Sequence, residues 1–174
     1  MKVTITLANN QNFRRLFTAV SLLLLAAPLS ADQVTYRVLV AGEDTGHLIV
    51  DRSERQFSID FDYKQNGRGP TFTESLKLDE RGFPVSWKIS GTTTFGSPVE
   101  EYFQADDDVA RWRDASGPGD ATYKSDPDFY VNQNGSSYAN ALLVRALLQS
   151  PDGKIPVYPS GEASVVKRWT RRVE

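Results

Sequence analysis

The sequence of 174 residues contains no cysteine and one histidine, His47. Without cysteine the chain has no disulfide, no thiolate metal site and no N-terminal cysteine to carry a lipid. A single imidazole cannot supply the two or three histidine ligands of a catalytic zinc centre. As a lone general base, His47 would still need an orienting carboxylate and a nucleophile, and no G-x-S-x-G motif occurs. We therefore assign no catalytic, cofactor-binding or metal-binding residue and expect no cofactor.

Long apolar runs are absent after residue 31, since the longest one, 139–148, is interrupted by Asn140 and Arg145. Residues 1–31 have the layout of a secretory signal peptide: a few basic residues, an apolar stretch at 16–25 and small residues up to Ala31. The apolar stretch is roughly a dozen residues long, whereas a spanning helix needs about 20. We predict cleavage after Ala31, a periplasmic or secreted product and no membrane span after cleavage.

Neither basic nor acidic residues are in large excess. The chain has 20 basic and 22 acidic residues, and residues 1–31 hold three of the basic ones and none of the acidic ones. Residues 32–174 therefore carry 17 basic against 22 acidic side chains, a net charge of −5. This balance predicts no nucleic-acid partner. The basic segment 167–172 is the exception, and we interpret it as a solvated strand face or a chain end.

From residue 33 onward, apolar and polar residues alternate, which is typical of half-buried antiparallel strands. In the segment 56–63, for example, Phe57, Ile59 and Phe61 alternate with polar residues. The expected turns lie at Gly42–Gly46, Asn66–Gly67, Asp79–Pro84 and Gly96–Pro98. A further short strand is predicted at 109–113, and the glycine-proline cluster at 116–120 is predicted to be a loop.

The periodicity changes near residue 138 and predicts one helix over 138–149. Ser136 or Ser137 can cap its start, and Pro151 with Gly153 ends it. Its apolar residues cover much of the helical surface, which predicts burial against the sheet. Two strands should follow, the last beginning near Ala163 and running to the terminus.

The predicted fold class is therefore mainly β. We expect one domain over 32–174, incomplete at its C-terminus, in which an antiparallel meander of about eight to ten strands forms a curled sheet or sandwich with one packing α-helix.

Three polar clusters are candidates for sites. Asp106–Asp108 lacks the ligand spacing and central glycine of a calcium loop, which favours a solvated turn. Glu100 and Glu101 are adjacent on a strand and point to opposite faces, so they cannot form an acid–base pair. Thr92–Thr94 suit an exposed pleat better than a hydroxyl-lined site. We interpret the carboxylates in general as residues of exposed strand faces.

Three segments resemble a known family: "YRVLVAGEDTGHLIVDR" at 36–52, the hairpin run at 57–103, and "YANALLVRALLQ" at 138–149. They are similar to the N-terminal β region that precedes the catalytic barrel in exported bacterial amidohydrolases of the imidazolonepropionase-like type. The similarity spans most of residues 34–165 and depends on hairpin sequences. In such proteins the barrel supplies a His-x-His pair, further histidines and an aspartate that bind one or two metal ions, usually zinc. None of these motif positions occurs here, so no catalytic residue is carried over.

The resemblance implies a non-catalytic, periplasmic accessory domain of a metal-dependent amidohydrolase, with the missing catalytic barrel as its partner. This chain would then be a fragment or truncated product, and the C–N hydrolase activity would belong to the full-length family. An alternative is a free-standing periplasmic binding module whose concave sheet holds an apolar or lipid-like ligand. A third hypothesis is a stand-alone enzyme that uses His47 with nearby carboxylates.

Overall fold

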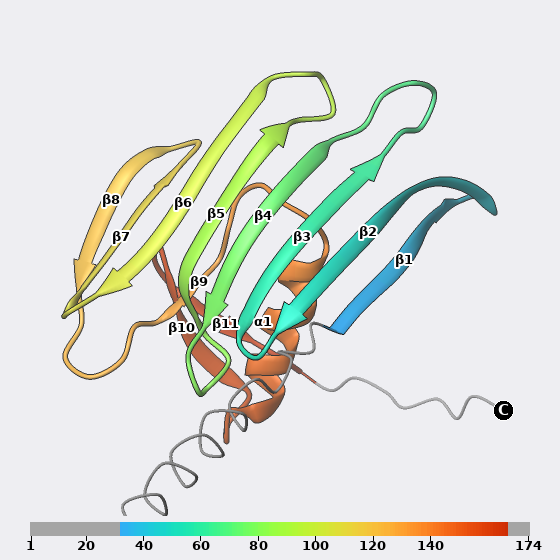
Figure 1. Cartoon of the computed structure of the whole chain (residues 1–174). Helices are drawn as coiled ribbons and strands as arrows, with labels where there is room; N and C mark the ends of the chain where they lie inside the picture. Colours follow the sequence, from blue (N-terminus) through green and yellow to red (C-terminus); the bar gives the residue numbers. More distant parts are fainter. Residues whose placement is uncertain (1–31, 167–174) are drawn as a thin grey trace, which may run out of the picture. The chain divides into compact units, whose positions relative to one another are not determined.

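A computed structural model describes residues 32–166 of the chain. Eight antiparallel strands form one sheet in which every strand pairs with its neighbours in sequence, so β1 and β8 are the two edges (Figure 1). The strands are β1 (Asp32–Val40), β2 (Glu43–Ser53), β3 (Gln56–Tyr63), β4 (Thr71–Leu78), β5 (Pro84–Thr92), β6 (Pro98–Asp106), β7 (Val109–Asp114) and β8 (Gly117–Thr122).

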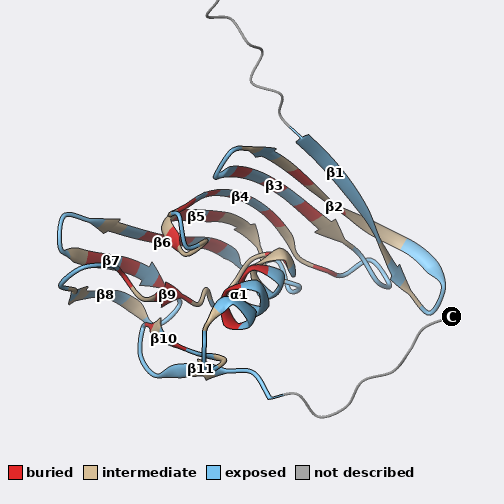
Figure 2. Cartoon of the chain, turned by 90° about the horizontal axis from the view of Figure 1, so that it is seen from below, coloured by how far each residue is buried: buried red, intermediate tan, exposed pale blue. Residues whose placement is uncertain are grey.

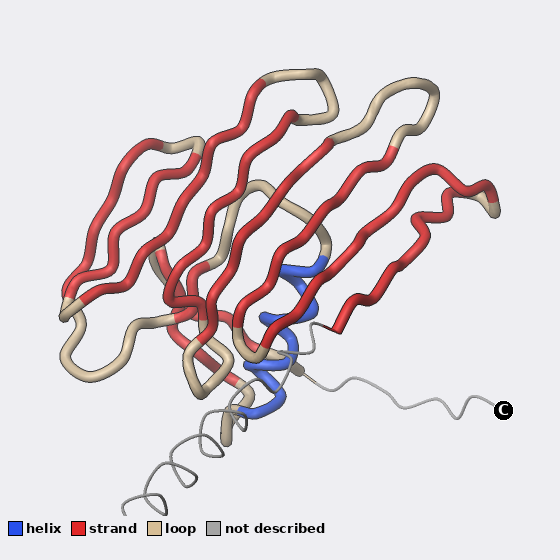
Figure 3. Tube along the Cα trace, in the orientation of Figure 1, coloured by secondary structure: helices blue, strands red, loops and turns tan. Residues whose placement is uncertain are grey.

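A second, smaller layer follows the meander. It consists of β9 (Phe129–Tyr130), the helix α1 (Tyr138–Gln149), β10 (Lys154–Tyr158) and β11 (Glu162–Ser164). Strand β10 pairs antiparallel with β11 and parallel with β9. Figure 3 shows these elements on one side of the large sheet. The mainly β, antiparallel fold with one packing helix is thus confirmed, although one strand pair is parallel.

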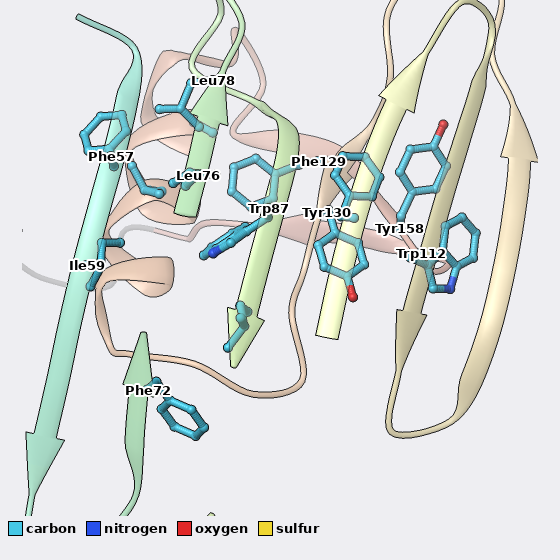
Figure 4. Packing of buried hydrophobic residues seen from close by; sticks show 14 of the residues in the cluster. Phe57, Ile59, Phe72, Leu76, Leu78, Trp87, Trp112, Phe129, Tyr130 and Tyr158 are labelled. Carbon is cyan, nitrogen blue, oxygen red and sulfur yellow. The ribbon is translucent and has the colours of Figure 1, made fainter. Parts of the chain in front are cut away.

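The large sheet curves around α1, and its two faces differ in burial (Figure 2). On the concave face, side chains from β2 to β7 form one hydrophobic cluster with α1, β9 and β10. Trp87 and Ile59 are fully buried there. Aromatic rings join the two layers: Trp112 of β7 stacks on Tyr158 of β10 at 5.4 Å between ring centroids (Figure 4). The convex face carries the polar residues that alternate with this core.

The first hairpin has a shorter turn than the predicted one at Gly42–Gly46. Ala41 and Gly42 alone form it, both with positive φ, and β2 begins at Glu43. Gly46 instead lies within β2 opposite Tyr63. A Cβ atom at Gly46 would lie 2.0 Å from the carbonyl oxygen of Asp62. This glycine therefore permits a close approach of two strands and makes no turn.

The prediction of a loop at 116–120 is also wrong, because most of this segment lies in β8. Strand β8 is an edge strand. Proline is tolerated there because the backbone N–H groups on the free side of the strand make no hydrogen bond to a neighbouring strand. Pro118 pairs with Arg113 in this position. Gly119 faces Trp112, and an added Cβ would lie 2.5 Å from the indole ring. The glycine leaves space for the tryptophan, a tertiary requirement that local composition cannot reveal.

Helix α1 spans the predicted range, but it is not buried on all sides. Leu142, Ala146 and Leu147 are buried, whereas Val144 and Leu148 are 48% and 70% exposed. Ser137 occupies the N-cap position without a side-chain hydrogen bond, and the Ser136 hydroxyl accepts from the Tyr138 N–H at 3.3 Å. The helix therefore covers the sheet with one face only.

Within residues 32–166, no helix combines the length and apolar character that a membrane span requires. The predicted signal peptide at 1–31 and the basic segment at 167–172 lie outside the described residues. The end of the predicted last strand also lies there, since β11 ends at Ser164.

Candidate functional site

His47 lies inside β2 on the convex face, and not beside a turn. Its Nε2 atom is 2.6 Å from Oδ1 of Asp60 on β3, and the two side chains are 42% and 55% exposed. A carboxylate that can orient the ring is therefore present. The nearby Thr71 hydroxyl, however, donates to Asp62 Oδ2 at 2.5 Å. Within the described residues no hydroxyl hydrogen-bonds to the His47 ring, so the pair has no positioned nucleophile.

The other polar clusters lie on strands and turns of the large sheet. Thr92 ends β5, and Thr93 and Thr94 lie in the connection to β6 and not on an exposed pleat. Asp106 ends β6, and Asp107 and Asp108 form the exposed turn before β7, where Asp107 has a positive φ of 55°. Glu100 is exposed, and Glu101 is buried on the opposite face of β6. Among residues 32–166, no three His, Cys, Asp or Glu side chains are grouped to hold a metal ion.

The most distinctive chemistry of the described chain is a row of carboxylates on the concave face. Glu74 of β4 and Glu101 of β6 both lie opposite Ile89 of the strand between them. Their exposed fractions are 1% and 3%, far below the usual values for glutamate. The general interpretation of the strand carboxylates as exposed is therefore wrong for these two.

Glu101 accepts hydrogen bonds with both carboxylate oxygens. Oε1 accepts from the Tyr130 hydroxyl at 2.8 Å and from the Gln133 N–H at 2.9 Å. Oε2 accepts from the backbone N–H of Asn134 at 3.0 Å and from its side-chain amide at 3.1 Å. Burial and the neighbouring Glu101 carboxylate raise the pKa of Tyr130, so this hydroxyl keeps its proton and acts as a donor.

Glu74 binds the same connection nearer to the helix. Its Oε2 accepts from the Trp87 indole N–H at 2.9 Å, and its Oε1 accepts from the Ser136 N–H at 2.5 Å. Burial raises the pKa of Glu74, the hydrogen bonds from Ser136 and Trp87 oppose that shift, and the charge of Glu101 adds to it. We call Glu74, Glu101 and the connection 131–137 between β9 and α1 the carboxylate clamp.

Gly135 lets the connection lie directly on the carboxylate row. It has a φ of +119°, and a Cβ there would lie 3.2 Å from Oε1 of Glu74 and 3.2 Å from Cδ1 of Ile89. The Asn132 side-chain amide would be closer still, at 2.8 Å, and this amide also donates to the Asn134 carbonyl. The connection thus covers both carboxylates.

A depression of 170 Å³ is lined by the connection and by the start of α1. Neither Glu74 nor Glu101 lines it. Its walls are the side chains and backbone of Phe129, Val131, Asn132, Gln133, Asn134, Gly135, Ser136, Ala139, Asn140 and Leu143. The connection therefore separates the two carboxylates from a molecule in this depression. The clamp can hold backbone in place, but it offers no carboxylate to a substrate there.

Asp114 of β7 extends the row toward the sheet edge, and it is satisfied only in part. Its Oδ1 accepts from the Ser116 N–H at 2.7 Å, while its buried Oδ2 has no hydrogen-bond partner. The side chain is 7% exposed. An unpaired buried carboxylate oxygen costs stability.

The clamp was not predicted from the sequence because glutamate was assumed to be exposed as a residue type. The alternation of buried and exposed positions along each strand was not used to assign its face. Glu74 alternates in phase with Phe72 and Leu76, which are buried, and Glu101 alternates in phase with Val99 and Phe103. Both glutamates therefore fall on the core face of their strands. Only the tertiary fold shows which donors they meet, since those donors are 13 to 62 residues away in the chain.

Comparisons of the chain with protein-family models, with curated proteins and with solved structures found no match.

Proposed function

We propose that this chain is a non-catalytic, exported β domain that supports a separate catalytic barrel of the metal-dependent amidohydrolase type. The proposal begins from the similarity of its hairpin and helix segments to the N-terminal region of such enzymes. The observation that carries the non-catalytic role is the carboxylate clamp. Both oxygens of Glu74 and Glu101 accept hydrogen bonds from this chain's own groups, and residues 131–137 cover them.

The metal-ligating residue types of this chain also favour catalysis in the separate barrel. A catalytic zinc site needs several imidazole, thiolate or carboxylate ligands directed at one point. This chain has one histidine and no cysteine, and the partner of that histidine, Asp60, lies on the solvent-exposed convex face. These residues do not fit a zinc centre, so the metal ions of the proposed enzyme would belong to the barrel.

The alternative role as a carrier of an apolar ligand finds less support. The concave face is filled by α1, β9 and β10, which form a single hydrophobic cluster with the sheet. A ligand on that face would have to displace this layer. The depressions of 340 and 510 Å³ lie elsewhere, over the serine-rich convex face near Ser58 and Ser75 and between the hairpin tips near Arg68 and Phe95.

The first test is to read the DNA downstream of codon 174. We expect a continuing or adjacent reading frame that encodes a His-x-His motif with further histidines and an aspartate. Co-expression of that product with this chain should yield a complex, and removal of this chain should lower the thermal stability of the barrel. A genomic neighbourhood without any such frame would contradict the proposal.

The second test uses the chain as purified from the cell, incubated with Zn²⁺ and N-acyl amide substrates. We expect no hydrolysis that chelators abolish, and no change with His47→Ala. Chelator-sensitive hydrolysis by the chain alone would overturn the proposal, and its loss in His47→Ala would favour the third hypothesis. Native mass spectrometry of the same sample tests the carrier role, because a carrier would retain a co-purified lipid.

A further inference from the structure

The two edges of the large sheet differ in how they are protected. Strand β8 has six residues, among them Pro118, whose missing N–H interrupts any ladder with a further strand. Strand β1 has nine residues, and it contains no proline, glycine or lysine. It pairs with β2 on one side only, and within residues 32–166 no strand pairs with its other side. From Asp32 to Val38, before an irregularity between Val38 and Leu39, the free side of β1 therefore offers a continuous row of backbone donors and acceptors.

The concave face of β1 is also apolar, and it is covered at Val38 but not at Val34 and Tyr36. Val34 and Tyr36 are 40% and 49% exposed, although their register partners on β2, Val50 and Leu48, are buried. In Figure 2 the covering helix lies under the middle of the sheet, and β1 extends beyond it at one margin. The apolar surface of the concave face thus continues past the layer that buries it. A strand added beside β1 would cover part of this surface as well as the free backbone groups.

We propose that the occupant of this edge is a second copy of the chain, joined through antiparallel β1–β1 pairing about a twofold axis at Tyr36. In that register Tyr36 lies opposite its counterpart, Val34 lies opposite Val38, and Thr35 lies opposite Arg37. No charged residue of the strand then faces a like charge, and apolar side chains meet on the concave face. The central residues 34–38 lie in the regular part of β1, before the irregularity between Val38 and Leu39.

The sequence of β1 itself selects this register. An axis at Arg37 would place two guanidinium groups directly opposite each other, which is unfavourable. The axis at Tyr36 centres the pairing on residues 34–38, in the regular part of the strand, and avoids that contact. A twofold pairing of this kind is closed, because it uses the free edge of both copies. It therefore gives a dimer without further growth, since β8 remains as the protected outer edge of each copy.

The absence of cysteine makes cross-linking a direct test. Residues directly opposite on antiparallel strands have Cα atoms about 4.5–5.5 Å apart, which a disulfide can bridge. We expect Tyr36→Cys, expressed from the full sequence and purified from the cell, to form a covalent dimer under mild oxidation. The matched control is Tyr102→Cys, because Tyr102 is also an exposed aromatic residue, at 39%, but lies on the convex face of the central strand β6. Equal cross-linking of the two variants would overturn the proposal.

Sedimentation velocity over a range of concentrations supplies the second measurement. We expect the unmodified chain to dimerise reversibly and Tyr36→Lys to raise the dissociation constant at least about tenfold, because two like charges would then face each other. Tyr102→Lys should leave it unchanged, and circular dichroism should show that both variants fold. A chain that stays monomeric up to about 1 mM, or that dimerises equally well with lysine at either position, refutes the proposal. A different protein bound at β1 of a monomeric chain refutes it too.

Discussion

The two faces of the large sheet both carry acidic side chains, but these have different environments and different partners. On the convex face, Asp60 and Asp62 are partly exposed and contact His47 and Lys64. On the concave face, Glu74 and Glu101 are buried and accept hydrogen bonds from a connection far along the chain. Exposed ion pairs contribute little to stability because water and salt screen them. Buried carboxylates contribute only through the donors they satisfy, and they are costly when those donors are lost.

This difference explains how a strand meander positions its second layer. A sheet with a purely apolar concave face would hold α1 by area alone, which fixes no unique placement. The clamp adds directional bonds to Gln133, Asn134 and Ser136, immediately before the helix begins. We infer that these bonds set where the chain turns from β9 into α1, while the aromatic contacts supply most of the burial.

The largest effect is expected when the clamp loses Glu101. Glu101→Ala leaves the backbone N–H groups of Gln133 and Asn134 and the Tyr130 hydroxyl without their acceptor. Because each unsatisfied buried donor is costly, we expect a loss of about 3 kcal/mol or more in the free energy of unfolding. Urea titration followed by tryptophan fluorescence measures this change.

Glu100→Ala is the matched control, since Glu100 is the adjacent residue on the exposed face of the same strand. It should change the free energy of unfolding by less than about 0.5 kcal/mol. Similar losses in the two variants would show that burial does not distinguish the two faces in the way we describe.

A smaller effect is expected from the backbone of the clamp. Gly135→Ala introduces a Cβ against Asn132, Glu74 and Ile89 in a residue with a φ of +119°. We expect a loss of about 2 kcal/mol from strain and displacement of the connection. Gly82→Ala provides the comparison, because Gly82 has a φ of +83° but its added Cβ meets no atom within 4 Å. The difference between the two variants, measured by thermal unfolding, isolates the contact with the carboxylate row.

The pH dependence of stability should have opposite signs on the two faces. Burial raises the pKa of Glu74 above its unfolded value of 4.5, so its contribution is fully present below pH 4.5 and is lost as pH rises through the folded pKa. The hydrogen bond from Thr71, together with Lys64, lowers the pKa of Asp62. Its contribution is therefore present above the unfolded value of 3.8 and is lost as pH falls through the folded pKa.

Subtraction of variants isolates these two groups from the other carboxylates. The free energy of unfolding of the unmodified chain minus that of Glu74→Gln should decrease as pH rises above 4.5. The corresponding difference for Asp62→Asn should decrease as pH falls below 3.8. Urea titrations across that range give both curves. Parallel slopes would contradict the contrast between the faces.

Sequence periodicity predicts the meander well because local rules govern it. Alternation sets the exposed and buried faces of β3 and β4, and Asn66–Gly67 forms the expected tight turn with positive φ at both residues. The helix range also follows from local signals. Strand β8 escapes prediction because its Pro and Gly residues are acceptable only at a sheet edge beside Trp112, and edge position is a property of the whole sheet.

Only half of the clamp can be predicted from the sequence. The phase of Glu74 and Glu101 places them on the core face, but their donors come from a connection whose path depends on the second layer. The pairing of Glu74 with the Ser136 N–H, for instance, joins residues 62 positions apart. Composition and spacing carry no information on such contacts, because any buried carboxylate needs donors and many segments contain them.

The smallest predicted effect concerns Asp114, whose Oδ2 atom is the one buried side-chain oxygen without a partner in the described chain. Asp114→Asn keeps the acceptor for the Ser116 N–H and replaces the unpaired oxygen with an amide that carries no charge. Removing a buried unpaired charge beside Glu101 and Tyr130 should raise the free energy of unfolding by about 1 kcal/mol. Asp120→Asn, at an exposed position of the paired strand β8, should leave it unchanged. Stabilisation by the first variant alone would show that the carboxylate row is held for its hydrogen bonds and not for its charge. Destabilisation would instead show that Asp114 has a favourable role as an anion.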